Sequence, residues 1–319
     1  MMEKAQPIWQ ELPTHCKADV VSYLDFESRC LLRSCSKSDY DLVKSCPVYL
    51  GKVELFPPTR FALSEQSYQI DEFKQVMVFL QVFQHPKSYA REVSINFDRF
   101  YESGDIQQFF ILLLDSMKTK TDFKIKSASL YINDHAKTVN GREFLELLQF
   151  FDSSKLKKIN LSSQIAPEYF EMVSKTEQWK NATELKAFGY YNYNIPIESL
   201  LHFDRLNVQH INRLSTEKAW KFIENFLRRN PALGSCFQVQ TMFALDIDGI
   251  LENFSVFPNN EPTEHEYSTY YKHTQLFELP NPNHICVVKI SEHGIYAAVC
   301  RITHLEPDFR WYLFGVRIE

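Results

Sequence analysis

Residues 7–47 read PIWQELPTHCKADVVSYLDFESRCLLRSCSKSDYDLVKSCP, and this stretch predicts three short helices. The chain cannot be helical up to Pro13, because the residue before a proline is pushed out of the α region. Thr14 can then cap a first helix, in which apolar residues recur at helical spacing. These apolar residues are Cys16, Val20, Val21 and Leu24.

Two further caps divide the rest of this stretch. Asp25 is expected to cap the second helix, while Ser36 and Asp39 have the spacing of a capping box for the third. Pro47 ends the third helix, since proline cannot continue it. The apolar sides of the two helices are expected to hold Phe26, Cys30 and Leu31 in the second, and Tyr40, Val43 and Cys46 in the third.

The same stretch resembles an F-box over about forty residues. The matching residues are Trp9, Leu12, Pro13, Val20, Val21, Tyr23, Leu24, Asp25, Phe26, Arg29, Leu32, Arg33, Cys35, Ser36 and Lys37. This resemblance implies docking to the SKP adaptor of a cullin–RING ubiquitin ligase, with the rest of the chain choosing the substrate. The alternative is a generic three-helix cap on a larger domain.

An F-box would offer its adaptor an apolar surface. The residues expected to form it are Leu12, Pro13, Val20, Val21, Leu24, Leu31 and Leu32. Each large aliphatic side chain that is fully buried there contributes ~1.5–3 kcal/mol, before the cost of ordering and association. The sequence does not separate the residues that face the adaptor from those that pack inside the module.

The size and charge of the chain bound the remaining possibilities. A length of 319 residues suits one small module and one larger domain. We expect an F-box over residues 1–48, a linker and a covering helix over 49–90, and a substrate-binding domain over 91–319. The net charge of −5 argues against a dominant nucleic-acid role. The eight glycines lie too far apart for any glycine-rich phosphate loop.

Cysteine usage and hydropathy predict an intracellular protein, cytoplasmic or nuclear. The seven cysteines are odd in number and form no CxxC pair, which is typical of buried, reduced thiols. The N-terminus has no apolar signal core, and the longest purely apolar run, residues 109–114, is too short to span a bilayer. No membrane contact is expected.

A repeated strand–helix unit begins near residue 91. The strand-like segments are 93–97, 128–132, 157–161, 184–188, 205–209 and 236–240, and the helices between them are expected at 106–117, 142–151, 167–174, 197–201 and 216–229. Strand spacings of about 20 to 35 residues match the irregular period of leucine-rich-repeat solenoids. Stacked units would give a curved parallel sheet with helices on one side, so we expect a degenerate leucine-rich-repeat-like array in an α/β fold.

Three other segments frame this array. A covering helix is expected to begin at Asp71 and end near Gln84. Residues 258–283 are polar and predict a long loop or a frayed edge. The β-rich runs 284–290 and 295–303 flank a four-residue gap with a glycine, which predicts an antiparallel hairpin, and 310–318 would add a third strand to a C-terminal β-meander.

The region from about 90 to 310 also resembles the FTH domain. Segment 155–161 (KLKKINL) carries this resemblance, together with Trp179, Asn181, Glu184 and Leu185. The FTH domain accompanies the F-box in a large family expanded in nematodes. It implies a domain that binds the protein substrate.

The sequence offers no catalytic or metal-binding motif, and we expect neither an enzyme nor a cofactor. Segment 244–251 (ALDIDGIL) superficially matches the aspartate motif of haloacid-dehalogenase-like phosphatases, but Ile250 stands where that family has threonine. Asp246 or Asp248 is instead expected to cap a helix after the sixth strand. The histidines form no HxxxH pair.

Two lysine clusters stand out among the charges. They comprise Lys118, Lys120, Lys124 and Lys126, and then Lys155, Lys157 and Lys158. They are either solvated edges of the repeats or a surface for an acidic partner.

Three functions remain open from the sequence. The first is a non-catalytic substrate receptor of an SCF-type ubiquitin ligase, which acts in ubiquitin-dependent protein degradation. Its partners would be an SKP-type adaptor, through it a cullin, and an unknown protein substrate. The second is an adaptor-bound scaffold or regulator without a degradation substrate. The third is a phosphatase-like hydrolase that uses Asp246 and Asp248.

Overall fold

The structure is a computed structural model that describes residues 9–58, 60–64, 66–97, 103–134, 141–162, 165–191, 196–256 and 271–302. The chain contacts divide it into two compact units. The first comprises residues 1–131 and 149–156, and the second comprises residues 132–148 and 157–319.

The first unit begins with the three predicted helices. They are α1 (Thr14–Tyr23), α2 (Phe26–Cys35) and α3 (Lys37–Ser45), preceded by the 3-10 turn η1 (Trp9–Glu11). The caps of α2 and α3 are confirmed. Asp25 Oδ1 accepts from the Ser28 amide at 2.7 Å, and Ser36 Oγ accepts from the Asp39 amide at 3.0 Å. The predicted cap of α1 is wrong, because Pro13 occupies that position and Thr14 is already helical.

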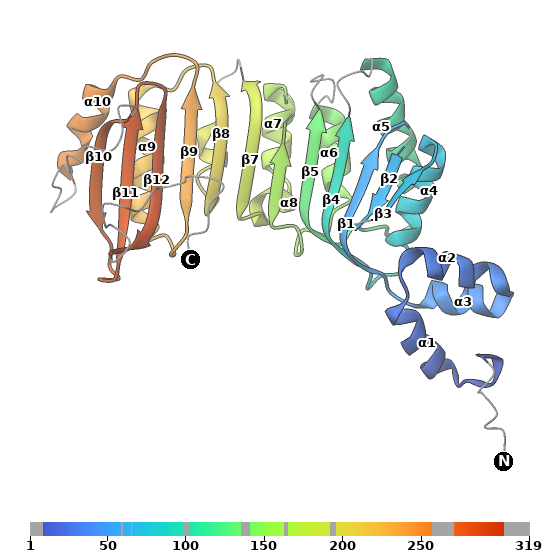
Figure 1. The fold of residues 1–319 in the computed structure, drawn as a ribbon. Coiled ribbons are helices and arrows are strands. Elements are labelled where there is room, and N and C mark those ends of the chain that lie inside the picture. Colours follow the sequence, from blue (N-terminus) through green and yellow to red (C-terminus); the bar gives the residue numbers. More distant parts are fainter. Residues whose placement is uncertain are drawn as a thin grey trace. The chain divides into compact units, whose positions relative to one another are not determined.

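A strand-rich part follows in the same unit (Figure 1). Its elements are β1 (Tyr49–Phe56), β2 (Arg60–Leu63), β3 (Gln66–Gln69), α4 (Glu72–Val82), β4 (Tyr89–Phe97), α5 (Ser103–Lys118) and the beginning of β5 (Ser127–Asp134). The strand order is β3–β2–β1–β4–β5. β1 pairs parallel to β4 and antiparallel to β2. The residues expected to form a linker therefore contain the strands β1, β2 and β3.

The second unit contains the other strand–helix repeats. Its helices and turns are α6 (Gly141–Gln149), α7 (Pro167–Ser174), α8 (Glu177–Asn181), η2 (Ile197–Ser199), α9 (Thr216–Arg228), α10 (Ile247–Glu252) and η3 (Asn253–Val256). Its strands are β6 (Lys158–Leu161), β7 (Glu184–Tyr191), β8 (Arg205–Ile211), β9 (Cys236–Thr241), β10 (Tyr271–Glu278), β11 (His284–Ser291) and β12 (Gly294–Arg301).

The strand order of the second unit is β6–β7–β8–β9–β12–β11–β10. β6 to β9 run parallel in sequence order, as predicted from the repeated unit. The predicted helix at 197–201 is only the short 3-10 turn η2, and α8 was not predicted. A mixed α/β fold with an N-terminal three-helix segment and a strand-rich sheet is therefore confirmed.

The C-terminal strands correct one prediction. The hairpin is confirmed, since β11 and β12 pair antiparallel and Ser291 opposes Gly294 at the turn. Residues 271–278, however, form β10, an edge strand, within the segment expected to be a long loop or a frayed edge. β10 pairs antiparallel with β11, and this partner supplies backbone hydrogen bonds that the polar composition of the segment does not reveal. The predicted strand at 310–318 lies outside the described residues.

Aromatic side chains join the strands to the helices in each unit. In the first unit, the ring of Phe97 on β4 lies 5.5 Å from that of Phe110 on α5. In the second, Phe237 on β9 lies 5.1 Å from Phe226 on α9, and Figure 1 shows α7, α8 and α9 on one side of these strands. Because side chains alternate along a strand, the residues between these aromatic positions lie on the other side of the sheet.

Candidate functional site

The three-helix segment has a small apolar core of its own. Val21 from α1 is fully buried and packs with Leu42, Val43 and Cys46 at the end of α3. Four partly buried residues close this core: Trp9, Ala18, Leu24 and Leu32. Tyr40, predicted to point inward, is 40% exposed. Val43 and Cys46 lie inward as predicted, and Leu42 rather than Tyr40 joins them in the core.

A buried arginine ties the ends of these helices together. Arg29 on α2 is only 4% exposed. Its guanidinium donates to the carbonyls of Leu24 at 3.2 Å, Pro47 at 2.8 Å and Ser22 at 3.4 Å. Burial lowers the pKa of Arg29. A guanidinium presents five N–H donors in a fixed fork, so one side chain satisfies carbonyls from two separate helix ends.

A second polar contact fixes the lead-in to α3. Asp39 accepts from Ser36 Oγ at 2.6 Å and from Trp9 Nε1 at 2.8 Å. These hydrogen bonds stabilise the carboxylate and lower the pKa of Asp39. The arrangement holds the Trp9 side chain against the core of the module.

The residues expected at the adaptor surface differ in how far their side chains are exposed. Leu31 on α2 is 65% exposed, Val20 on α1 is 43% exposed, and Pro13 is exposed. Val21 is fully buried in the helical core. The half-buried members of the set are Leu12, Leu24 and Leu32, and the last two pack against that core.

Tyr23, at the end of α1, was missing from the predicted set. It is 90% exposed and follows Val20 by three residues, so both lie on the same side of α1. That spacing was present in the sequence and could have identified it. The exposed apolar residues of α1 and α2, Val20, Tyr23 and Leu31 together with Pro13, are called the apolar helix surface below.

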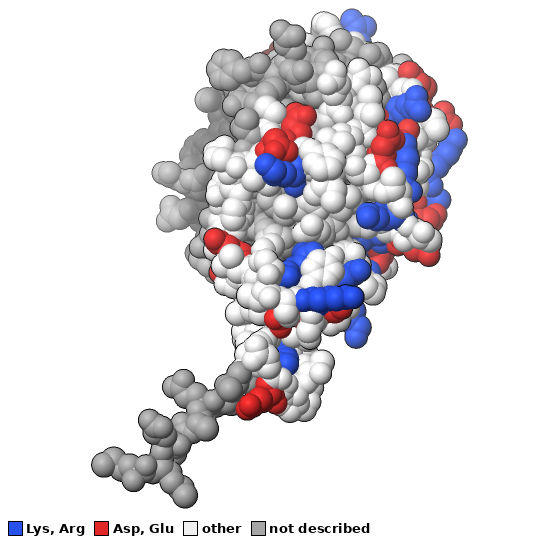
Figure 2. Space-filling model, turned by 90° about the vertical axis from the view of Figure 1, so that its right-hand side faces the viewer, with Lys and Arg blue, Asp and Glu red and all other residues white. Residues whose placement is uncertain are grey.

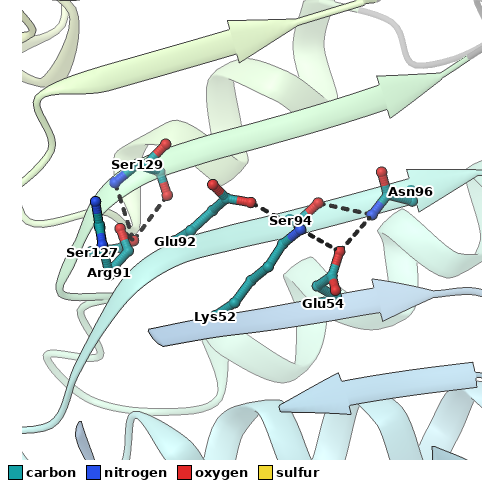
Figure 3. Close-up of polar contacts among 8 residues, drawn as sticks. All are labelled: Lys52, Glu54, Arg91, Glu92, Ser94, Asn96, Ser127 and Ser129. Atoms are coloured by element: carbon teal, nitrogen blue, oxygen red, sulfur yellow. Dashed lines mark hydrogen bonds and ion pairs between the residues drawn. The ribbon is translucent and has the colours of Figure 1, made fainter. Parts of the chain in front are cut away.

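A polar sheet face lies on the first unit, on the side of β1 and β4 away from Phe97 (Figure 3). Lys52 Nζ lies 2.7 Å from Glu54 Oε1 and 3.2 Å from Glu92 Oε1. Asn96 Nδ2 donates to Ser94 Oγ at 2.8 Å and to Glu54 Oε1 at 3.4 Å. Burial acts to lower the pKa of Lys52, but the two carboxylates raise it overall. This part of the sheet therefore carries a connected set of charges.

Polar residues also line up across the second unit. Asn160, Lys186, Asn207, Gln238 and Tyr296 are successive partners in the register from β6 to β12. They lie on the side away from α9, since Gln238 follows the helix-facing Phe237. Asn207, Gln238 and Tyr296 are buried, whereas Lys186 and Asn160 are half-buried. We call this set the polar row.

One aspartate of the phosphatase-like motif, Asp246, has a structural role. Asp246 Oδ1 accepts from the Gly249 amide at 3.1 Å and caps α10, which confirms one of the two expected caps. Its other oxygen accepts from Thr216 Oγ1 at 3.0 Å, at the start of α9. Both oxygens thus join two helix ends, and Asp248 lies exposed on the first turn of α10.

In the part of the chain that the structure describes, no group of three or more His, Cys, Asp or Glu side chains could hold a metal ion. None of the described helices combines the length and hydrophobicity that a bilayer span requires.

Comparison with known proteins identifies two domains. A family model for the F-box domain matches residues 9–51, and one for the FTH domain matches residues 107–257. An uncharacterized F-box protein of Caenorhabditis elegans is 39% identical over 70 residues, which cover 22% of this chain and 17% of that protein. No solved structure matches the chain. The chain therefore carries an F-box domain and an FTH domain.

Proposed function

We propose that this protein is a substrate receptor of an SCF-type cullin–RING ubiquitin ligase. The observation that carries the proposal is an F-box match over a three-helix module with exposed apolar side chains. F-box domains bind SKP-type adaptors, and through the adaptor the chain would join a cullin. F-box and FTH domains are interaction domains, so the receptor acts without chemistry of its own.

The physical role of such a receptor is to bring two proteins together. A substrate held on the same complex as the charged ubiquitin-conjugating enzyme meets it at a raised effective concentration. The adaptor contact would form at the apolar helix surface, where Leu31, Val20 and Pro13 are exposed. Tyr23 joins them in this proposal, while Val21 acts through the core of the module.

The FTH domain is the proposed substrate-binding part. Its parallel strand–helix units support a degenerate leucine-rich-repeat-like array, in which helices pack on one side and the other side is left for a partner. Half-buried charged residues lie on that other side beside the polar row. Lys158 Nζ and Glu184 Oε1 form an ion pair there at 2.8 Å, next to Lys186.

Adaptor capture tests the docking premise. The full chain is mixed with a purified SKP-type adaptor, and the dissociation constant is measured by calorimetry for wild type, Leu31→Ala and Val20→Ala. A large aliphatic residue buried in the interface contributes ~1.5–3 kcal/mol, so we expect roughly a 10-fold to 100-fold loss for Leu31→Ala. Ile111→Ala is the matched control, because Ile111 is 50% exposed but lies on α5, outside the F-box.

The outcomes separate the remaining functions. A wild-type chain that does not bind the adaptor would contradict both the receptor and the scaffold roles. Equal losses for Leu31→Ala and Ile111→Ala would contradict the proposed surface. If the adaptor binds, the receptor role predicts that some proteins accumulate when the chain is removed. Their abundance should fall again when the wild-type chain is restored, but not when Leu31→Ala is supplied instead. A scaffold without a degradation substrate predicts no such accumulation.

A further inference from the structure

A cleft of about 690 Å³ lies within the first unit, beside the F-box helices. Its lining comes from several segments of this unit. Arg33 comes from α2 and Tyr40 from α3, while the end of α4 and its following turn contribute residues between Met77 and Pro86. The loop after α5 contributes Thr119 to Lys124 with Lys126, and Asp152 completes the lining. This volume lies in the usual range for a site that holds a small ligand or several side chains of a peptide.

The cleft offers apolar surface that is accessible to a partner. Tyr40 and Met77 are 40% and 38% exposed, although both belong to helices with a buried side. Buried residues lie behind them, since Leu80 and Phe83 from the same α4 segment also line the cleft. A partner that covers this surface removes aromatic and thioether groups from water, which favours binding.

The charges around the cleft are strongly unbalanced. Four cations line it, Arg33, Lys120, Lys124 and Lys126, against two carboxylates. The chain as a whole has a net charge of −5, so this excess of positive charge is local. Lys and Arg side chains gather on the lower part of the face that Figure 2 presents. Within the described residues, none of the four cations forms an ion pair with a carboxylate of the chain.

Neutral groups of the protein hold three of these cations in place. Arg33 donates to Gln81 Oε1 at 3.1 Å and lies 5.0 Å above the ring of Tyr40. Lys124 Nζ donates to the Gln149 carbonyl at 2.9 Å, and Lys126 Nζ donates to the Pro86 carbonyl. A carbonyl orients a cation without neutralising it, so each keeps its charge for a partner. Lys120 is exposed on the loop.

We propose that this cleft binds an acidic, extended peptide segment of a protein partner. Carboxylates of the segment would contact Lys120, Lys124 and Arg33, and an apolar side chain between them would cover Tyr40 and Met77. Charge complementarity and an apolar floor in one cleft favour a peptide, which offers both kinds of group. Nucleic-acid binding rests chiefly on neutralising phosphates, which would leave the apolar floor of Tyr40 and Met77 unused.

This site is distinct from the apolar helix surface in its residues and in its chemistry. The cleft uses Arg33 and Tyr40, whereas the proposed adaptor contact uses Pro13, Val20, Tyr23 and Leu31. Peptide binding and adaptor capture can therefore be measured on the same variants, and the failure of one proposal leaves the other standing.

Fluorescence anisotropy of the full chain tests the cleft. The probe is a fluorescein-labelled peptide of alternating Glu, Asp and Leu, and its twin carries Gln and Asn in place of the acids. We expect the acidic probe to bind and the neutral twin to bind at least about tenfold more weakly. Raising the salt concentration should weaken the acidic probe, since exposed charges are screened within about 8 Å at physiological ionic strength.

Variants locate the binding. Lys120→Gln/Lys124→Gln removes two charges from the cleft and should weaken the acidic probe about tenfold, with adaptor capture unchanged. The matched control, Lys175→Gln/Lys180→Gln, removes two charges outside it, where the lysines pair with Glu171 at 2.6 Å and Glu177 at 3.0 Å. Met77→Ala should weaken the acidic probe as well, because it removes part of the floor.

Three results would overturn the proposal. They are no binding of the acidic probe to wild type, equal losses in the cleft and control variants, and tighter binding of a single-stranded RNA of mixed sequence than of the peptide. The last result would assign the basic rim to nucleic acid instead.

Discussion

At the residue scale, adjacent side chains in α1 have opposite roles. Val20 is 43% exposed and Val21 is fully buried, although both were predicted for one apolar surface. Helical spacing identifies an apolar stripe but not its centre, because the packing partners come from α3. The role of Arg29 was equally hidden, since its acceptors are carbonyls of distant residues such as Pro47.

The pKa of Asp39 gives a pH prediction at the same scale. Hydrogen bonds from Ser36 and Trp9 lower this pKa, so the carboxylate stabilises the folded module above the ordinary aspartate pKa of about 3.9. That contribution is lost as the pH falls through the lowered value. We therefore expect Asp39→Asn to destabilise α3 at neutral pH and to match wild type in strong acid.

Amide hydrogen exchange in α3, followed over pH, measures this difference. Asp41→Asn is the control, because Asp41 is exposed on the same helix and lies outside this contact. A gap between wild type and Asp39→Asn that stays constant below about pH 3 would contradict the linkage.

At the element scale, local patterns predicted the parallel strands well. β6, β7, β8 and β9 each carry alternating or continuous apolar residues between turns, and those signals lie inside the segment itself. β10 lacks such a signal, because its stability depends on pairing with β11. The cap of α10 by Asp246 was predictable for the same reason as the parallel strands, since a cap is a local contact.

Trp179 joins three short elements of the second unit, so its replacement should lower the stability of that unit. The ring is 1% exposed and lies 5.4 Å from Phe170 and 5.3 Å from Phe203, while Nε1 donates to the Ser199 carbonyl at 3.0 Å. Trp179→Ala should lower the free energy of unfolding by roughly 3–5 kcal/mol, through the lost contacts and the cavity. Trp179→Phe should cost about 1–3 kcal/mol, because the Ser199 carbonyl loses its donor.

Urea unfolding followed by far-ultraviolet circular dichroism checks both values. Met172→Ala serves as the control, since Met172 on α7 is 52% exposed and should change stability by less than about 0.5 kcal/mol. An unfolding curve for Trp179→Ala that overlays the control would show that the cluster is dispensable.

At the scale of the whole molecule, the reactivity of the cysteine thiols shows which of them the fold buries. Burial raises the pKa of Cys236 to about 11 and that of Cys300 to about 12, and it also raises the pKa of Cys286. The thiolate is the reactive form, so these three cysteines should resist alkylation near pH 8 in the folded chain. Cys35, which is exposed, should react first.

Iodoacetamide labelling with peptide mass spectrometry measures the order of reaction. A buried thiol also contributes stability while it stays protonated in both the folded and the unfolded chain, that is, below the ordinary cysteine pKa of about 8.5. The second unit should therefore lose stability as the pH rises from about 8.5 towards the raised pKa values of about 11 to 12. Labelling of Cys286 as fast as that of Cys35 under native conditions would contradict this picture of the core.

The position of β12 has a consequence for the synthesis of the chain. β12 lies between β9 and β11, although it is the last strand described in the sequence. One edge of β9 therefore stays without its final partner while the ribosome makes the residues up to Arg301, which takes several seconds at roughly 5–20 residues per second. An unpaired hydrophobic edge can add strands from other chains. Nascent chains that end before Gly294 should consequently aggregate or recruit chaperones. In a series of ribosome-bound chains of increasing length, the chaperones should be released once β12 is complete.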